Sequence, residues 1–440
     1  MDILNGKIKP MYFEYLVAAS GSAMVSSIFG MVDAMMVGKY HGPSGNAALA
    51  VFNPLWSIIY CLGLLAGIGG SVLFANKRGS GDEENAQQYF TISVVYGLVL
   101  SAIAMIGIGL YKEQLFRFFG ADDELLNLAK LYLKPIFFGL PCCVFSNILS
   151  AYLRNDNNPI LATIAVITGG LFNCIGDYLC VFTFDMGIFG AGLATAIGQY
   201  IAIIVMLTHF FKKKNTLKLV KPKKILEKVG TISITGFSTA INDLAMGIIG
   251  ILFNRQIMKY LGSDALAVYG IITQITAFAQ CLAYGAGQAA QPIISQNYGA
   301  GQNKRIKECL KYGLYTCAFM GIFWVTAMLV FPNVIMNFFM NPTEAVKEIA
   351  PNILRTYGIS YILLPLNLFA TYYFQSLMKP NLSMIVSIAR GSVISGIMIL
   401  LLPVILGKNS IWYAMLITEI LVALFVIFYM IKCTSPKFEF

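Results

Sequence analysis

The sequence predicts an all-α polytopic membrane protein, with twelve transmembrane helices in two pseudo-symmetric six-helix lobes. Hydrophobic residues make up 58% of its 440 residues and charged residues only 12%, whereas soluble domains carry about 25% charged residues. The mean hydropathy of +0.72 points the same way. Stretches of about 20 apolar residues, the length that crosses a bilayer, recur along the whole chain.

Twelve apolar stretches approach or exceed this length, and most are joined by short loops. The basic segment 212–230 is the largest break in composition. It is therefore the expected linker between an N-lobe, residues 1–211, and a C-lobe, residues 231–440. The expected spans are 12–38, 46–75, 89–110, 131–153, 159–181, 188–211, 231–258, 264–295, 309–331, 351–378, 383–406 and 411–431.

Short motifs recur in the same order in the two halves, which indicates a duplication. The offset between copies stays between 217 (Ala48 to Ala265) and 224 (Leu140 to Leu364). Six spans separate the copies, an even number, so both halves have the same topology and their pseudo-twofold axis runs along the membrane normal. We therefore expect a substrate to bind between the lobes or inside one of them, near mid-depth.

The basic residues indicate how the spans are oriented. If the N-terminus is cytoplasmic, the inside segments hold about twice as many Lys and Arg as the outside segments, as in other membrane proteins. We therefore expect a multi-pass protein of the cytoplasmic (inner) membrane with both termini in the cytoplasm. Eight lysines from Lys212 to Lys228 are expected to contact anionic membrane lipid. They lack the interleaved aromatic residues of a nucleic-acid site, so no nucleic-acid partner is expected.

Two aspartates, Asp33 and Asp177, lie inside predicted spans. A carboxylate at bilayer depth costs roughly 2.5–3.5 kcal/mol on insertion scales. Such a cost is tolerated mainly where the group faces a cavity and binds a ligand. The natural ligand is a proton or a small cation, so the two aspartates predict an ion-coupled transporter.

Polar side chains accompany Asp177 at helical spacing. Asn173 precedes Asp177 by four residues, so the two share a helix face, and Thr195 and Gln199 have the same spacing in the next span. Their oxygens could join the carboxylates around Na⁺, or the buried acid could take up a proton. The alternative is that Asn173, Thr195 and Gln199 only form hydrogen bonds between helices.

On these motifs the chain resembles the multidrug and toxic compound extrusion (MATE) family of the MOP superfamily. The resemblance covers nearly the whole chain and is greatest for the branch of DinF-type and MepA-type exporters. The local matches are Met31-Val32-Asp33, Asn173-x3-Asp177, the segment from Gly187 to Thr195, and the loop from Leu153 to Pro159.

The resemblance implies a secondary antiporter that exports small organic cations in exchange for H⁺ or Na⁺ by alternating access. It implies that Asp33, Asn173, Asp177 and Thr195 bind the coupling cation, including Na⁺ if that is the ion. No organic cofactor is expected, and the chain is expected to act as a monomer.

Four further residues are candidates for substrate or second-site contacts. For Asp243 the sequence leaves two interpretations open, a second ion or drug contact and a polar group paired with Asn242 or Gln274. Arg390 and Glu419 are expected to pair with each other in a structural role. The four candidates are Asn147, Gln199, Asp243 and Gln274.

Two other functions are weighed against transport of cations. A lipid-linked oligosaccharide flippase of the same superfamily would line its cavity with several Arg and Lys to hold pyrophosphate, and the spans offer only Arg390 and Arg255. A membrane-embedded enzyme would need a catalytic motif. Neither a zinc-protease motif nor a nucleophile elbow occurs in the sequence, so the chain is not expected to be an enzyme.

Overall fold

The computed structural model describes residues 2–339 and 342–434, without the side chains of Pro43, Asp243, Met246 and Thr434. Within these residues, twelve helices are long and apolar enough to cross a membrane, which confirms the prediction of twelve spans. Most extend several residues beyond the predicted bounds, because their ends project past the apolar stretch. The twelve spans are 8–42, 44–79, 83–118, 123–155, 159–183, 187–211, 225–260, 263–299, 303–330, 344–376, 380–405 and 408–433.

The described residues contain fourteen α-helices; all but the short α9 belong to the spans, and some spans are interrupted by short 3₁₀ or π segments. The first two spans run on as α1 through a kink at Gly42, whose φ of 65° suits glycine. The N-lobe contains α1 Ile8–Gly79, α2 Glu83–Phe118, α3 Asp123–Asn155, α4 Pro159–Tyr178 and α5 Gly187–Leu207. The C-lobe contains α6 Ile225–Tyr260, α7 Ser263–Gly299, α8 Asn303–Val330, α9 Pro332–Phe339, α10 Glu344–Gly358, α11 Leu364–Ser376, α12 Pro380–Ile388, α13 Ile394–Ile405 and α14 Ala414–Thr434.

Local sequence signals mark where several helices begin. The side chain of Asp82 accepts a hydrogen bond from the backbone N–H of Asn85 at the start of α2, and Asp122 caps α3 in the same way. Proline stands in the first turn of α4 and of α12, where the missing N–H costs no helical hydrogen bond.

The two lobes repeat their backbone features as well as their motifs. Asn157 and Met378 are both left-handed, with φ of 58° and 56°, and each precedes a helix-starting proline by two residues. The fifth span of each lobe contains a π-helical turn, Leu179–Thr183 in one and Ala389–Val393 in the other. These shared irregularities agree with a duplicated six-helix unit.

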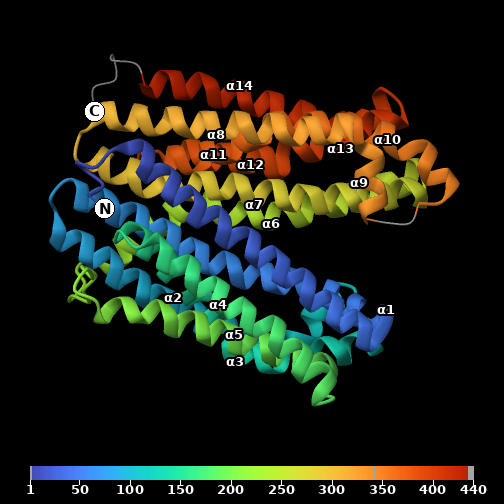
Figure 1. Cartoon of the computed structure of the whole chain (residues 1–440), viewed down its shortest axis with the longest axis horizontal. Helices are drawn as coiled ribbons and strands as arrows, with labels where there is room; N and C mark the ends of the chain where they lie inside the picture. The colour runs from blue at the N-terminus through green and yellow to red at the C-terminus, as the bar shows by residue number, and fades with distance from the viewer. Residues whose placement is uncertain (1, 340–341, 435–440) are drawn as a thin grey trace.

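Figure 1 shows the N-lobe helices, blue to green, below the C-lobe helices, yellow to red. Both chain ends lie at the left of this view, together with the segment 212–224 that joins the lobes. We call this end of the bundle the linker end. The opposite end, which carries the kink at Gly42, is called the Gly42 end.

The lobes touch closely at the linker end. A Cβ atom on Gly79 would lie 1.9 Å from the carbonyl oxygen of Gln296, and a Cβ on Gly299 would lie 1.9 Å from that of Asn76. The two contacts are reciprocal, as a pseudo-twofold axis between the lobes requires. Only glycine permits such an approach, so these two positions allow the lobes to pack closely at this end.

The linker is docked against the N-lobe. Since α6 begins at Ile225, the linker is 212–224 and is shorter than the predicted 212–230. Backbone N–H groups of Lys218 and Val220 donate to the side chains of Gln87 and Thr91 in α2. This part of the linker is therefore an ordered strap, held by side chains that accept its backbone hydrogen bonds.

The prediction that all eight lysines contact lipid is wrong for Lys228. Its side chain is buried, and its ammonium group donates to Asn85 and Gln88. Lys223 forms an ion pair with Glu84 at 2.7 Å. Polar residues at the start of α2 attract these lysines, which sequence spacing alone does not reveal.

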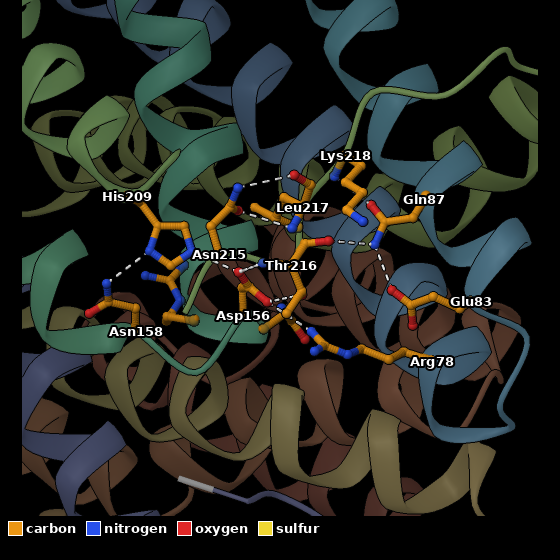
Figure 2. Close-up of polar contacts among 12 residues, drawn as sticks. Arg78, Glu83, Gln87, Asp156, Asn158, His209, Asn215, Thr216, Leu217 and Lys218 are labelled. Carbon is orange, nitrogen blue, oxygen red and sulfur yellow. Dashed lines mark hydrogen bonds and ion pairs between the residues drawn. The ribbon is translucent and has the colours of Figure 1, made fainter. Parts of the chain in front are cut away.

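Asp156 anchors the strap at the linker end (Figure 2). Its carboxylate accepts hydrogen bonds from Arg78 at 2.9 Å, from the His209 ring at 2.7 Å, and from the backbone N–H and hydroxyl of Thr216. Burial raises the pKa of Asp156, but these hydrogen bonds outweigh it and hold the pKa below its usual range. Asp156 therefore stays ionised at neutral pH and ties three segments together.

Replacing Asp156 by Asn should lower the melting temperature of the purified protein. Removing one member of a buried charged network costs about 3 kcal/mol, because its partners stay buried without a counter-charge. We also expect trypsin to cleave the lysine-rich start of the linker faster, since the strap loses its anchor. Scanning fluorimetry and timed digestion measure the two effects.

The matched control is Asp123→Asn, which removes an exposed ion pair with Arg117. Exposed pairs contribute little, so this variant should melt and digest like the wild type. Equal behaviour of Asp156→Asn and the control would show that Asp156 does not anchor the strap.

Candidate functional site

A cavity of about 550 Å³ lies between the lobes. The N-lobe supplies most of its wall through α1, α3, α4 and α5, and the C-lobe closes it with α6, α7 and α11. Among the described lining residues one is acidic, Asp33, and one is basic, Arg154. The aromatic lining includes Phe29, Phe52, Trp56, Tyr60, Tyr132, Tyr284 and Tyr372.

Asp33 lies in the first half of α1 and reaches the cavity wall. Its side chain is buried, with 8% of the residue's surface exposed. The hydroxyl of Tyr132, on α3, donates to one carboxylate oxygen of Asp33 at 2.7 Å. The other oxygen has no hydrogen-bond partner among the described residues, so it remains available to a ligand.

Asn173, Asp177 and Thr195 form the second part of the site, as their spacing predicts. The Asn173 amide donates to the Asp177 carboxylate at 3.3 Å and to the Thr195 hydroxyl at 3.1 Å. Asn173 and Thr195 line the cavity, while Asp177 lies behind them and is fully buried.

Small residues bring α4 and α5 close enough for these contacts. A Cβ atom on Gly169 would lie 2.5 Å from the carbonyl oxygen of Gly198, and one on Gly176 would lie 2.9 Å from the Cβ of Ala194. This packing of small side chains is typical of membrane helices that approach closely. It allows the short side chain of Thr195 to reach Asn173.

The two carboxylates form one electrostatic site. Asp33 and Asp177 are near enough for their charges to interact, and one oxygen of Asp177, like one of Asp33, lacks a partner in the described part of the chain. Two like charges in a buried site repel each other unless a proton or cation lies between them. The arrangement can therefore bind H⁺, or Na⁺ with the carboxylate, amide and hydroxyl oxygens nearby.

The other predicted contact residues have different outcomes. Asn147 and Gln199 line the cavity. Gln274 was predicted to contact substrate, but it is exposed on α7, on the face opposite the buried Ile272 and Thr276, and it is absent from the cavity wall. Asp243 belongs to α6, and its side chain is outside the described part of the structure.

Arg390 and Glu419 pair as predicted. Their side chains are 2.8 Å apart and buried inside the C-lobe. The Asn367 amide donates to the second carboxylate oxygen of Glu419 at 2.6 Å. None of the three lines the cavity, which agrees with a structural role.

Sequence reasoning missed Tyr132. It is the hydrogen-bond donor to Asp33, but it lies on another helix, 99 residues further along the chain. A buried tyrosine on a membrane helix is common, so the residue alone gives no signal. The signal that could have found it is its position on the face of α3 that continues to Cys143, Asn147 and Ser150, all of which line the cavity.

The chain is similar to proteins of the MatE family, whose sequence profile matches residues 18–179 and 238–401, one block in each lobe. It is 26% identical over 409 residues to the multidrug export protein MepA of Staphylococcus saprophyticus, covering 91% of this chain and 89% of that protein. It is 25% identical to MepA of Staphylococcus aureus, with coverage of 91% and 88%.

The fold is similar to those of solved transporters. An outward-facing multidrug resistance MATE family transporter of the MOP superfamily superposes with a TM-score of 0.91 at 22% identity, covering 98% of this chain and 97% of that one. A MOP superfamily transporter from Pyrococcus furiosus superposes with a TM-score of 0.91 at 21% identity, with coverage of 100% and 98%.

Replacing Asp33 by Asn should raise the melting temperature in mildly alkaline buffer. The substitution keeps the shape of the side chain and removes a buried charge that has an unpartnered oxygen and repels Asp177. Tyr132→Phe should act in the opposite direction, because it deletes a hydrogen bond to a charged group, worth about 1.5–3 kcal/mol. Scanning fluorimetry of the two purified variants tests both signs. If Asp33→Asn lowers the melting temperature as much as Tyr132→Phe does, then the buried charge of Asp33 does not destabilise the folded protein.

Proposed function

The chain belongs to the MatE family and is a membrane transporter, not an enzyme, and we propose that it exports small organic cations in exchange for H⁺ or Na⁺. The observation that carries this proposal is the buried pair Asp33 and Asp177, each with an unpartnered oxygen, at the wall of a cavity between two lobes. The relatives named as multidrug export proteins support the direction of transport.

The coupling step follows from charge. An empty acidic site carries like charges in a medium of low dielectric constant, and cation binding neutralises one of them. The ion-loaded and ion-free forms therefore favour different arrangements of the lobes. A one-for-one exchange of cations moves no net charge, so the concentration gradient of the entering ion drives it. Each net positive charge that enters beyond the exported one gains about 2.3 kcal/mol per 100 mV.

The cavity wall suits flat organic cations. Trp56, Tyr60, Tyr284 and Tyr372 provide aromatic faces, and such faces attract cations within about 6 Å. Asp33 adds a negative charge on the same wall. A wall of aromatic faces accepts flat cations of varied shape, as a multidrug exporter requires.

Alternating access is supported by the contacts at the linker end. The reciprocal glycine contacts close the lobes there, and Asn155 bonds to Gln291 across the interface at 3.2 Å. We take the linker end as cytoplasmic, so the closed end faces the cytoplasm and the cavity opens outward. We propose that the protein works as a monomer in the cytoplasmic membrane, because one chain supplies both lobes and the cavity between them.

A lipid-linked oligosaccharide flippase is not favoured. A pyrophosphate group would need several basic side chains, and the described cavity wall contains a single one, Arg154.

Replacing Asp33 by Asn should abolish efflux of a fluorescent organic cation from proteoliposomes, although the protein still inserts and purifies. The loss should occur with whichever imposed gradient, Na⁺ or pH, drives the wild type. Comparing the two gradients in wild type identifies the coupling ion. Matched vesicles with Asp123→Asn, which removes an exposed carboxylate outside the cavity wall, should retain ion-driven efflux. Wild-type efflux rates in Asp33→Asn would refute the role of this site.

The proposed orientation makes a separate prediction about exposed positions at the two ends. In a background without native cysteines, Lys213→Cys at the linker end should resist a membrane-impermeant thiol reagent in intact cells. Asn409→Cys, at the opposite end, should react. Both residues are exposed, so their reactivity reports the side of the membrane. Labelling of position 213 from outside would invert the topology and the direction of transport.

A further inference from the structure

Arg154 is a buried cation at the floor of the cavity. It occupies the last turn of α3, at the linker end, and only 6% of its surface is exposed. It nevertheless lines the cavity, together with Asn147 and Ser150 on the same face of α3. The guanidinium thus borders the space that a substrate would occupy.

No carboxylate neutralises Arg154 in the described part of the chain. Its side chain makes one hydrogen bond, to the Ser150 hydroxyl at 3.0 Å. The other buried arginine, Arg390, lies 2.8 Å from the carboxylate of Glu419. Taking a guanidinium out of water is costly, and a single neutral hydroxyl does not compensate for the lost hydration. A counter-charge from a ligand would.

The duplication shows that the fold does not require a cation at this position. Because Asn157 corresponds to Met378, the counterpart of Arg154 in the C-lobe is Gln375. The Gln375 amide donates to a backbone carbonyl and two hydroxyls of α6 at 2.7–2.8 Å, so it serves as a neutral packing residue. Arg154 differs from it in charge and in having a cavity in front of it.

We propose that Arg154 binds the carboxylate of those transported substrates that carry one, and so determines how tightly they are held relative to plain cations. This inference rests on the proposed export function and assigns one specificity-determining residue of its cavity. The planar guanidinium matches a carboxylate with two parallel hydrogen bonds. Ser150, one turn before Arg154 on α3, and Gln288 of α7 also line the cavity and can donate further hydrogen bonds.

The anion site is separate from the acidic site. Tyr132, which contacts Asp33, and Arg154 lie on the same helix, 22 residues apart (154 minus 132). At 1.5 Å per residue this spacing corresponds to roughly 33 Å of helix. A substrate carboxylate on Arg154 therefore does not compete with the coupling cation. The positively charged body of the same molecule extends along the aromatic wall between the two sites.

A matched pair of dyes tests the proposal. One is a rhodamine with a free benzoic acid, which is zwitterionic at neutral pH, and the other is its methyl ester, a plain cation with the same chromophore. Fluorescence anisotropy with purified protein in nanodiscs measures both affinities. Wild type should bind the acid at least as tightly as the ester. A wild type that binds the acid about tenfold more weakly than the ester would overturn the proposal without any variant.

Variants locate the interaction. Arg154→Gln, which copies the C-lobe residue, should weaken binding of the acid by about tenfold or more, because a charge-assisted pair is lost. Binding of the ester should change by less than about twofold. Arg154→Lys keeps the positive charge but loses the planar guanidinium that forms two parallel hydrogen bonds. It should weaken binding of the acid by an intermediate factor. The exposed Arg117→Gln is the control for loss of one positive charge and should bind both dyes like wild type.

The outcomes separate this inference from the proposed function. If Arg154→Gln and Arg154→Lys each weaken binding of the acid and of the ester by the same factor, Arg154 has a purely structural role and the inference is rejected. Ion-driven efflux of the ester by wild type tests the export function independently of Arg154. If the ester is exported and the acid is neither bound nor exported, the proposed function stands and the inference fails.

Discussion

The energetic cost of buried carboxylates is the constraint on which the structure depends. Asp33 and Asp177 lie in a bundle whose spans are otherwise apolar, and one oxygen of each has no partner among the described residues. A site of this kind is stable only with a cation or a proton present for part of its cycle. The close packing of α4 on α5, the Tyr132 hydroxyl and the adjacent cavity all serve to hold and expose that site.

Much of this site could be predicted because its signals are local in sequence. Asn173 and Asp177 share a helix face through their four-residue spacing, and Thr195 follows in the next span of the same hairpin. The spans themselves follow from apolar length. Tyr132 could not be predicted as the partner of Asp33, because helix pairing within the lobe, and not spacing, brings them together.

Other features depend on which face of a helix is buried. Membrane helices are apolar all round, so periodicity does not reveal the inner face, and the sequence does not show that Gln274 is exposed and lies outside the cavity wall. The linker gives a similar lesson. Its lysines suggest a free cytoplasmic loop, yet Asp156, Gln87 and Thr91 bind its backbone. Basic composition predicts the side of the membrane and says little about docking of the chain.

We propose that the two ends of the cavity have different tasks, with a cation site at Asp33 and an anion site at Arg154. The central claim is that the coupling cation binds the acidic pair. Infrared difference spectroscopy of purified protein tests it most directly, since it detects carboxyl groups that gain or lose a proton or a metal ion. We predict a carboxyl band that changes when H⁺ or Na⁺ is added and that is absent from Asp33→Asn. A carboxyl band that is unaffected by either ion, or that persists unchanged in Asp33→Asn, would contradict the account.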